Sequence, residues 1–491
     1  MFNLLIALLL NKFMKKLTLL LLSVFVLCSV SAEVILPKVI TNNMVLQHDK
    51  PVAIWGKASA DEKVIVQFAG QTKTTVTDTA GNWQVKLDPM KASTEPRKMI
   101  ITGSNSITLN NILVGEVWLC SGQSNMDYPL DRKIKRYAGP KKGEDVADKE
   151  LSAVKNPLIR ILFVEHKLQS EFPTKGWTDC NDTIVRYVSA AGYFFAKELA
   201  NELKIPIGII SSSWGGTRVE QWTPASAYEK SPLFKDSIAG KQNFKIDGMA
   251  PGKMFEGMLR PVIPYTLKGF VWYQGESNLI IHDTTTFAAK TRLMLDAWRG
   301  LWNDKNLSFY FVQIAPHNYS KRKDKLTHGA DLLPYYWEAQ SKCLDFPKTG
   351  MVVTTDLVDD LSNIHPSYKW EVGRRLSLWA LAKDYGKKVV YSGPLYKKMK
   401  VKKHAIELTF TQNGSGLIST DGKPLNWFTV AGKDKVFVPA EAVIKGNKVI
   451  VSSKQVPDPV AVRFAWYETA MPNFFNKEKL PASPFRTDSW K

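Results

Sequence analysis

Four short polar segments carry the residue types needed for nucleophilic attack on an ester, and each follows an apolar run. They lie at residues 121–126, 211–217, 274–278 and 359–366. The first holds Ser124 and the last holds His365, a nucleophile and a base able to take its proton. Glycines let backbone N–H groups approach an oxyanion, and Asn and Gln side chains add uncharged donors. These residue types predict acyl transfer through a serine.

The apolar runs before these segments predict strands that alternate with helices. Strand patterns occur at 115–120, 207–210, 269–273, 309–314 and 351–355, and helical patterns at 190–203, 287–302 and 369–382. Such alternation is typical of the α/β class, with a mainly parallel sheet covered by helices on both faces. Because the carboxyl ends of parallel strands meet at one edge, we expect the polar segments to converge there.

The regions on either side of this pattern favour β structure. Short alternating runs at 64–68 and 82–87, with Gly, Asp and Asn turn signals between them, predict a β-sandwich-like domain. Similar runs occur near the C-terminus, at 405–410, 435–438, 448–451 and 460–464. The predicted organisation is a signal peptide (1–32), an N-terminal β domain (33–112), a catalytic domain (113–388) and a C-terminal β region (389–491).

The first residues predict export. The basic pair Lys15 and Lys16 precedes an apolar run at 17–27 and small residues that end at Ala32. This order is typical of a secretory signal peptide, so we expect cleavage near Ala32 and a secreted or periplasmic protein. A membrane anchor is the alternative, but the run is shorter than the roughly 20 residues of a span. No later run predicts a membrane span.

Composition restricts the partners and cofactors. The formal net charge is +20, but the lysines are scattered and no nucleic-acid-binding motif accompanies them, which favours a solvated basic surface. No spacing of Cys or His residues indicates a metal site. Cys120, Cys180 and Cys343 follow the predicted signal peptide; Cys120 is expected in the core, and a Cys180–Cys343 pair stays open. Nothing in the sequence indicates an oligomeric state.

The polar segments also resemble a known family. Gly-Gln-Ser-Asn-Met (122–126), Trp-Gly-Gly-Thr (214–217), Gln-Gly-Glu-Ser (274–277) and Asn-Ile-His-Pro (363–366) are similar to four sequence blocks of the sialate O-acetylesterases, within the SGNH hydrolase superfamily. Segments near both ends of the chain are similar as well. The resemblance implies a flavodoxin-like three-layer αβα sheet and a cofactor-independent carbohydrate esterase. Its implied substrate is an O-acetylated sugar, first of all O-acetylated sialic acid.

The resemblance implies roles for individual residues of the catalytic machinery. Ser124 would be the nucleophile and His365 the general base. The backbone N–H of Ser124, with that of Gly215 or Gly216, would form the oxyanion hole, and Gln274 would lie near the acyl group. No metal takes part in this scheme.

Other residues are expected to contact the substrate. Asn125 and Asn278 belong to the matching blocks, and Arg218 follows one of them. An anionic substrate such as sialic acid would give Arg218 a carboxylate to bind with two parallel hydrogen bonds. A salt bridge from Arg218 to Glu220 is an equal alternative. His282 and His317 are the other histidines expected to line a cleft.

One position departs from the superfamily pattern. Many members carry an acid three residues before the histidine, where this chain has Ser362. A carboxylate there would orient the imidazole and stabilise its protonated form. Asp360 is the first choice as substitute because it lies in the same loop, and Glu276 is the rival. Asp359 and Asp356 are further candidates, and a Ser–His pair without an acid is also compatible.

Two other functions stay open. Similar enzymes act on acetylated plant polysaccharides such as xyloglucan or xylan. A carbohydrate-binding protein with a decayed active site is the non-enzymatic alternative, and the intact Ser124 and His365 argue against it.

Overall fold

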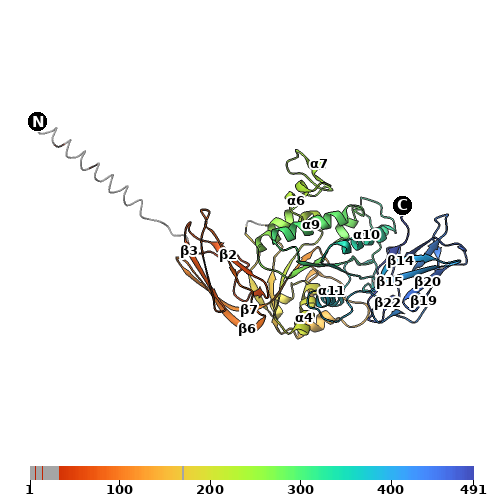
Figure 1. Cartoon of the computed structure of the whole chain (residues 1–491), viewed down its shortest axis with the longest axis horizontal. Coiled ribbons are helices and arrows are strands. Elements are labelled where there is room, and N and C mark those ends of the chain that lie inside the picture. The colour runs from red at the N-terminus through yellow and green to blue at the C-terminus, as the bar shows by residue number, and fades with distance from the viewer. Residues whose placement is uncertain (1–5, 7–13, 15–32, 169–170, 324, 491) are drawn as a thin grey trace. The chain divides into compact units, whose positions relative to one another are not determined.

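The computed structural model describes residues 33–168, 171–323 and 325–490, together with Ile6 and Met14 (Figure 1). The predicted signal peptide therefore lies, apart from those two residues, outside the described part of the chain. No described helix is long and apolar enough to cross a membrane. The described residues form two compact units: one is made of residues 33–37, Ile54–Leu87 and Lys98–Leu109, and the other of Lys38–Ala53, Asp88–Arg97 and the described residues from Asn110 onward. The predicted catalytic domain and C-terminal β region thus belong to one unit.

The smaller unit is built from strands of the predicted N-terminal β domain. β3 (Lys63–Phe68) pairs antiparallel with β4 (Gln71–Val76) and β6 (Ser93–Thr102). β2 (Val52–Lys57) and β5 (Asn82–Leu87) form a separate two-stranded sheet. Alternate residues of β3 and β5 are buried, because successive side chains of a strand point to opposite faces. The strands predicted at 64–68 and 82–87 are confirmed.

The larger unit contains the predicted α/β sheet, whose strand order is β13-β12-β11-β7-β10-β8-β9. All neighbours in this order are parallel except the antiparallel edge strand β9. The strands are β7 (Ser106–Gly122), β8 (Asn156–Phe163), β9 (Trp177–Cys180), β10 (Ile207–Ser213), β11 (Gly269–Tyr273), β12 (Ser308–Val312) and β13 (Thr349–Val352). If β8 and β9 are left out, the other five strands can be numbered along the chain from β7 (1) to β13 (5). Their order across the sheet is then the flavodoxin-like 2-1-3-4-5. The chain therefore changes direction across the sheet at β7, where such folds place their sites.

Helices cover both faces of the sheet, as predicted. α4 (Ala190–Leu203) and α11 (Lys369–Lys383) pack together on one face, where Trp118 of β7 lies 5.1 Å from Phe195 of α4 between ring centroids. α9 (Phe287–Leu301) covers the other face, where Trp298 packs on Phe270 and Trp272 of β11. Alternate residues of the buried strands point to opposite faces, so each layer has its own apolar contacts.

Shorter elements complete the unit. β1 (Val45–Gln47) pairs parallel with β7, and α10 (Leu332–Ser341) lies beside α9. The remaining short helices are α2 (Val146–Ser152), α3 (Asp182–Val185), α5 (Val219–Trp222), α6 (Ala225–Lys230), α7 (Lys235–Ile238) and α8 (Glu276–Leu279), with single turns η1 (Arg132–Lys135), η2 (Phe255–Leu259), η3 (Arg260–Val262), η4 (Tyr319–Lys321) and η5 (Lys342–Asp345). The thiols of Cys120, Cys180 and Cys343 are all buried and free, so Cys180 and Cys343 form no disulfide.

The C-terminal residues form small antiparallel sheets around a cluster of phenylalanines. The strand order of one sheet is β14 (Leu395–Val401), β15 (Ile406–Thr411), β20 (Lys448–Ser452), β19 (Glu441–Lys445). The order of a second sheet is β18 (Val438–Pro439), β17 (Phe428–Ala431), β21 (Ala461–Phe464), β23 (Phe485–Arg486). In a third, β16 (Leu417–Ser419) pairs with β22 (Phe474–Asn476). The strand predicted at 435–438 is largely wrong, because Lys435 closes a turn with Gly432 and has a φ of 65°.

Candidate active site

The turn after β7 presents Ser124. Gly122 has a φ of 145°, and a Cβ at this position would lie 2.2 Å from the carbonyl oxygen of Tyr273 in β11. Only glycine fits there, and it lets β7 turn sharply beside β11. The residues flanking Ser124 are buried, whereas Ser124 itself is partly exposed. The hydroxyl is thus held in a rigid turn at the edge of the sheet with access to solvent.

His365 lies against Ser124, although the two are 241 residues apart in sequence. The imidazole Nε2 is 2.9 Å from the Ser124 Oγ, which is hydrogen-bonding distance. The ring also packs on Tyr137, with 4.6 Å between ring centroids. The loop that carries His365 joins β13 to α11, so two strand ends of the sheet bring the pair together. This geometry is suited to proton transfer from the serine to the imidazole.

The environment of His365 keeps the imidazole neutral. Burial lowers the pKa of His365 to about 4 from its ordinary value of 6.5. The charges of Lys369, Lys135 and His317 lower this pKa further, and Asp127 opposes them. A general base must be unprotonated to accept a proton, so the His365 ring is in its competent form at neutral pH.

We expect kcat/KM for an acetyl ester to rise with pH through the His365 pKa at about 4, and to be level above about pH 5. Below the pKa the ring is protonated and cannot accept the Ser124 proton, so activity falls on the acid side. The profile can be measured from about pH 3 to 8 at constant ionic strength, with preincubated samples reassayed at neutral pH to separate titration from unfolding. An acid limb at 6.5 or above would contradict the expectation.

The loop after β10 contributes the predicted glycines. A Cβ on Gly215 would lie 3.5 Å from the Cβ of Ser124, and the N–H of Trp214 donates to the carbonyl of Gly122 at 3.0 Å. Gly216 adopts a φ of 73°, which favours glycine. The loop is thus fixed beside the nucleophile. The oxyanion-hole role of the N–H groups of Ser124, Gly215 and Gly216 stays a prediction.

Gln274 ties three loops together. Its Nε2 donates to the Oδ1 of Asn278 at 2.7 Å, the Oε1 of Gln123 at 3.2 Å and the carbonyl of Thr217 at 3.3 Å. A primary amide has two N–H bonds, and these three acceptors already share them. The Oε1 of Gln123 also accepts hydrogen bonds from the N–H groups of Gly275 and Ser277 at the start of α8. The sequence pattern alone does not predict this structural role of Gln123. A role for Gln274 toward the acyl group stays a prediction.

The carboxylates closest to His365 in sequence bind other partners. Asp360 accepts from the N–H and Oγ of Ser362, and it pairs with Lys141 at 2.7 Å. These contacts, that of Lys141 first, hold the pKa of Asp360 well below its usual range. Asp359 binds the hydroxyl of Tyr368, and Asp356 pairs with Arg375. Within the described ranges, no carboxylate shares a hydrogen bond with the His365 ring.

Glu276 is buried at the first position of α8. Its Oε1 accepts a hydrogen bond from the Nδ2 of Asn125, and its Oε2 has no partner among the described residues. Burial raises the pKa of this carboxyl. Asn125 in turn donates to the main-chain carbonyl of Ile364 at 3.1 Å. Glu276 therefore reaches the His365 loop through Asn125 rather than by direct contact with the ring.

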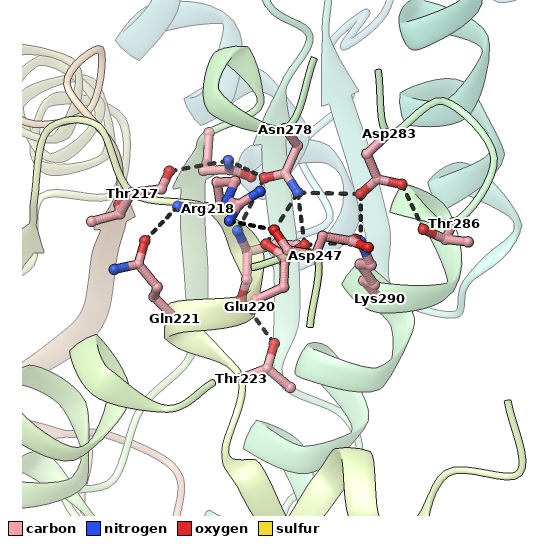
Figure 2. Close-up of polar contacts among 12 residues, drawn as sticks. Thr217, Arg218, Glu220, Gln221, Thr223, Asp247, Asn278, Asp283, Thr286 and Lys290 are labelled. Carbon is pink, nitrogen blue, oxygen red and sulfur yellow. Dashed lines mark hydrogen bonds and ion pairs between the residues drawn. The ribbon is translucent and has the colours of Figure 1, made fainter. Parts of the chain in front are cut away.

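An ionic cluster around the buried Lys290 lies next to Arg218, which follows the glycine loop of residues 214–217 (Figure 2). The Nζ of Lys290 is 2.8 Å from Glu220 and 2.9 Å from Asp283, and it also bonds to Asp247. Asn278 donates to Glu220 and Asp283 and accepts from Gln274, so the cluster supports the site wall. The three carboxylates lie close enough to hold a metal ion, but the Lys290 ammonium bonds to all of them.

The position of Lys290 in the sequence already indicates that it is buried. Lys290 stands three residues after Phe287 and four before Met294, on the apolar face of the predicted helix. A lysine at such a spacing is buried, and a buried lysine needs acidic partners.

The predicted substrate contacts lie inside the protein. Arg218 is 6% exposed and donates to the carbonyl of Asp247 at 2.9 Å. Its alternative salt bridge to Glu220 is not formed, because Glu220 pairs with Lys290. Asn125 and Asn278 are fully buried with their side chains bonded inward. These three residues support the walls of the site, and their contact with substrate stays a prediction.

The two histidines expected to line a cleft differ in setting. His317 is buried and close enough to His365 for its charge to lower the His365 pKa. His282 instead bonds to His328, with 2.9 Å between their ring nitrogens. His317 is thus the one that the structure brings toward the Ser124–His365 pair.

Comparison with known proteins gives a family that agrees with this geometry. Residues 114–380, from β7 through most of α11, match the family model described as "Carbohydrate esterase, sialic acid-specific acetylesterase". The sialate O-acetylesterase of Homo sapiens is 28% identical in an alignment that covers 91% of each chain. That of Mus musculus is 27% identical, and the alignment covers 91% of this chain and 93% of the mouse protein. The crystal structure of a carbohydrate acetylesterase from Xanthomonas citri superposes with a TM-score of 0.82 at 32% identity, covering 93% of this chain and 100% of that one. This chain therefore belongs to the carbohydrate esterase family of sialic acid-specific acetylesterases and is an ester hydrolase.

Proposed function

We propose that this protein is a secreted carbohydrate O-acetylesterase that works through an acetyl-enzyme on Ser124. The observation that carries the mechanism is the 2.9 Å contact between the Ser124 Oγ and the His365 Nε2, in a site where the imidazole is neutral. Secretion is supported by the signal-peptide pattern of residues 15–32.

The reaction proceeds in two half-reactions. The Ser124 Oγ attacks the acetyl carbonyl carbon while His365 takes the serine proton. The tetrahedral intermediate then expels the sugar oxygen, which receives that proton from His365. Water attacks the acetyl-serine with His365 again as base, and acetate leaves with Ser124 restored. In this proposal the backbone N–H groups of Ser124 and of Gly215 or Gly216 stabilise the oxyanion in both halves, which the closeness of Gly215 to Ser124 supports.

O-acetylated sialic acid is the proposed substrate. The family description and the sialate O-acetylesterases that match over most of the chain support it. Because Arg218 is buried, the sialate carboxylate needs another cation. We assign this role to Lys141, because its side chain is 59% exposed and its partner Asp360 lies on the loop that carries His365.

Acetyl esters of neutral polysaccharides are the second candidate. The burial of Arg218 and its bond to a main-chain carbonyl favour them, because a neutral sugar requires no buried cation for recognition. Acetylated xylan and xyloglucan represent this class.

We expect the wild-type protein to release acetate from O-acetylated sialic acid with a higher kcat/KM than from acetylated xylan or xyloglucan. Lys141→Met should raise KM for the sialate ester about two- to fivefold, because an ion pair at an exposed lysine contributes up to about 1 kcal/mol. The same variant should leave KM for the uncharged 4-nitrophenyl acetate unchanged. Acetate release can be followed with all substrates on one protein sample. Preference for the neutral polysaccharides would overturn the sialate assignment, and an equal effect of Lys141→Met on both esters would overturn the role of Lys141.

A further inference from the structure

Three buried polar side chains form a connected chain beneath the Ser124–His365 pair. Asn125 follows the nucleophile in the turn after β7, Glu276 begins α8 and Lys369 begins α11. Their exposed fractions are 0%, 2% and 1%. The Nζ of Lys369 donates to the Oδ1 of Asn125 at 2.8 Å, and the Nδ2 of Asn125 donates to the Oε1 of Glu276. Asn125 is thus held from both ends of its amide.

Two of these side chains, Asn125 and Lys369, bind the backbone on both sides of His365. The Nδ2 of Asn125 donates to the carbonyl of Ile364 at 3.1 Å. The Nζ of Lys369 donates to the carbonyl of Pro366 at 2.5 Å. The residues before and after the general base are therefore fixed by the same side chains that fix the residue after the nucleophile.

The burial of a lysine and a glutamate at this place needs a reason, because removing ionisable groups from water is costly. Burial lowers the pKa of Lys369 to about 7 and raises that of Glu276. The rings of Tyr128 and Tyr273 lie 4.8 Å and 5.3 Å from the Lys369 Nζ, so aromatic faces rather than water surround it. Two apolar residues would fill the same space, but they would leave the Pro366 carbonyl unbound and would remove the partners of the Asn125 amide.

We propose that Lys369 and Glu276 are positioning residues. Together with Asn125 they hold the backbone of the His365 loop, so that the imidazole stays aligned with Ser124 although no carboxylate among the described residues binds the ring. The inference rests on the proposed function of the Ser124–His365 pair. In a Ser-His-Asp triad the aspartate orients the ring through its second nitrogen. Here the loop carboxylates bind Lys141, Tyr368 and Arg375, and the orientation comes from the main chain on either side of the ring.

The test compares Lys369→Met, the double variant Lys369→Met/Glu276→Gln, and Lys383→Met as a matched control. Lys383 is an exposed lysine in the last turn of the same helix, α11. The double variant removes both ionisable groups, so no unpaired buried charge remains, while the amide introduced by Glu276→Gln retains an oxygen for Asn125. All variants are assayed for kcat and KM with 4-nitrophenyl acetate, for thermal unfolding and for the pH profile.

We expect Lys369→Met to lower kcat about 10- to 100-fold with KM within about threefold, because a misplacement of about 1 Å at a reacting group costs up to about 10²-fold in rate. The double variant should regain thermal stability but not kcat. The groups facing the His365 ring are Lys369, Lys135, His317 and Asp127, so loss of the Lys369 ammonium should move the acid limb upward by about half a pH unit or more. Lys383→Met should behave as wild type.

Two results would overturn the inference. One is a wild-type kcat in Lys369→Met. The other is recovery of both stability and kcat in the double variant, which would show that Lys369 serves only to neutralise Glu276. If Lys369→Met is too unstable to assay, the kcat of the double variant decides. A wild-type protein that is no more active than Ser124→Ala would instead refute the proposed function, whatever Lys369 does.

Discussion

Replacing Ser124 with alanine is expected to lower kcat for 4-nitrophenyl acetate by at least about 10⁴-fold. The variant loses the nucleophile that bonds to His365 at 2.9 Å and retains the neighbouring glycine loop, so substrate binding should change little. His365→Ala should cost a similar factor. The double variant should be no slower than either single one, because a nucleophile and its base act as a unit. Steady-state kinetics on the three variants measures this directly.

Ser152→Ala is the control for the serine substitution. Ser152 is exposed at the end of α2 and bonds only locally, to the carbonyl of Lys149. Its replacement should leave kcat and KM at wild-type values. A Ser124→Ala protein that is correctly folded by circular dichroism and keeps more than about a tenth of the wild-type kcat would contradict the assignment of the nucleophile.

Replacing Lys290 with methionine is expected to lower the free energy of unfolding by about 3–5 kcal/mol, because it leaves buried carboxylates without their cation. Lys290, Glu220 and Asp283 all have side chains at most 3% exposed, and the ammonium bonds to both acids within 2.9 Å. The acids surrounding Lys290, Glu220 first, raise its pKa against the opposing effect of burial. Urea unfolding followed by tryptophan fluorescence measures the change.

A surface ion pair provides the comparison. Lys149 and Glu144 are 3.0 Å apart, but their side chains are 71% and 65% exposed. Water screens such a pair, so Lys149→Met should change stability by less than about 1 kcal/mol. Equal effects of the two substitutions would show that the Lys290 cluster has no special energetic role. Lys290→Met should also lower kcat, since Asn278 and through it Gln274 are held by the same acids.

Most elements of the catalytic unit could be predicted from local patterns, with informative exceptions. The helix at 190–203 was predicted to the residue, and those at 287–302 and 369–382 to within one residue of α9 and α11. Local patterns do not indicate β8, because Pro157 and Arg160 interrupt its apolar run. They do not indicate α10 either, because Pro334 and a run of aromatic residues obscure its helical pattern. The predicted boundary at 112/113 falls inside β7, which runs without a break from Ser106 to Gly122.

By itself, the sequence determined the nucleophile and the base as candidates and the edge of the sheet at which they meet. The sequence could determine these features because polar segments that follow parallel strands converge at one edge of the sheet, whatever the details of packing. Only the tertiary structure decided where the charged side chains point. Asp360 lies five residues before His365 yet bonds to Lys141, whereas Lys369 and Glu276 come from different helices and share Asn125. The partners of a charged group depend on burial and on chains brought close by folding, and neither is encoded by spacing along the sequence.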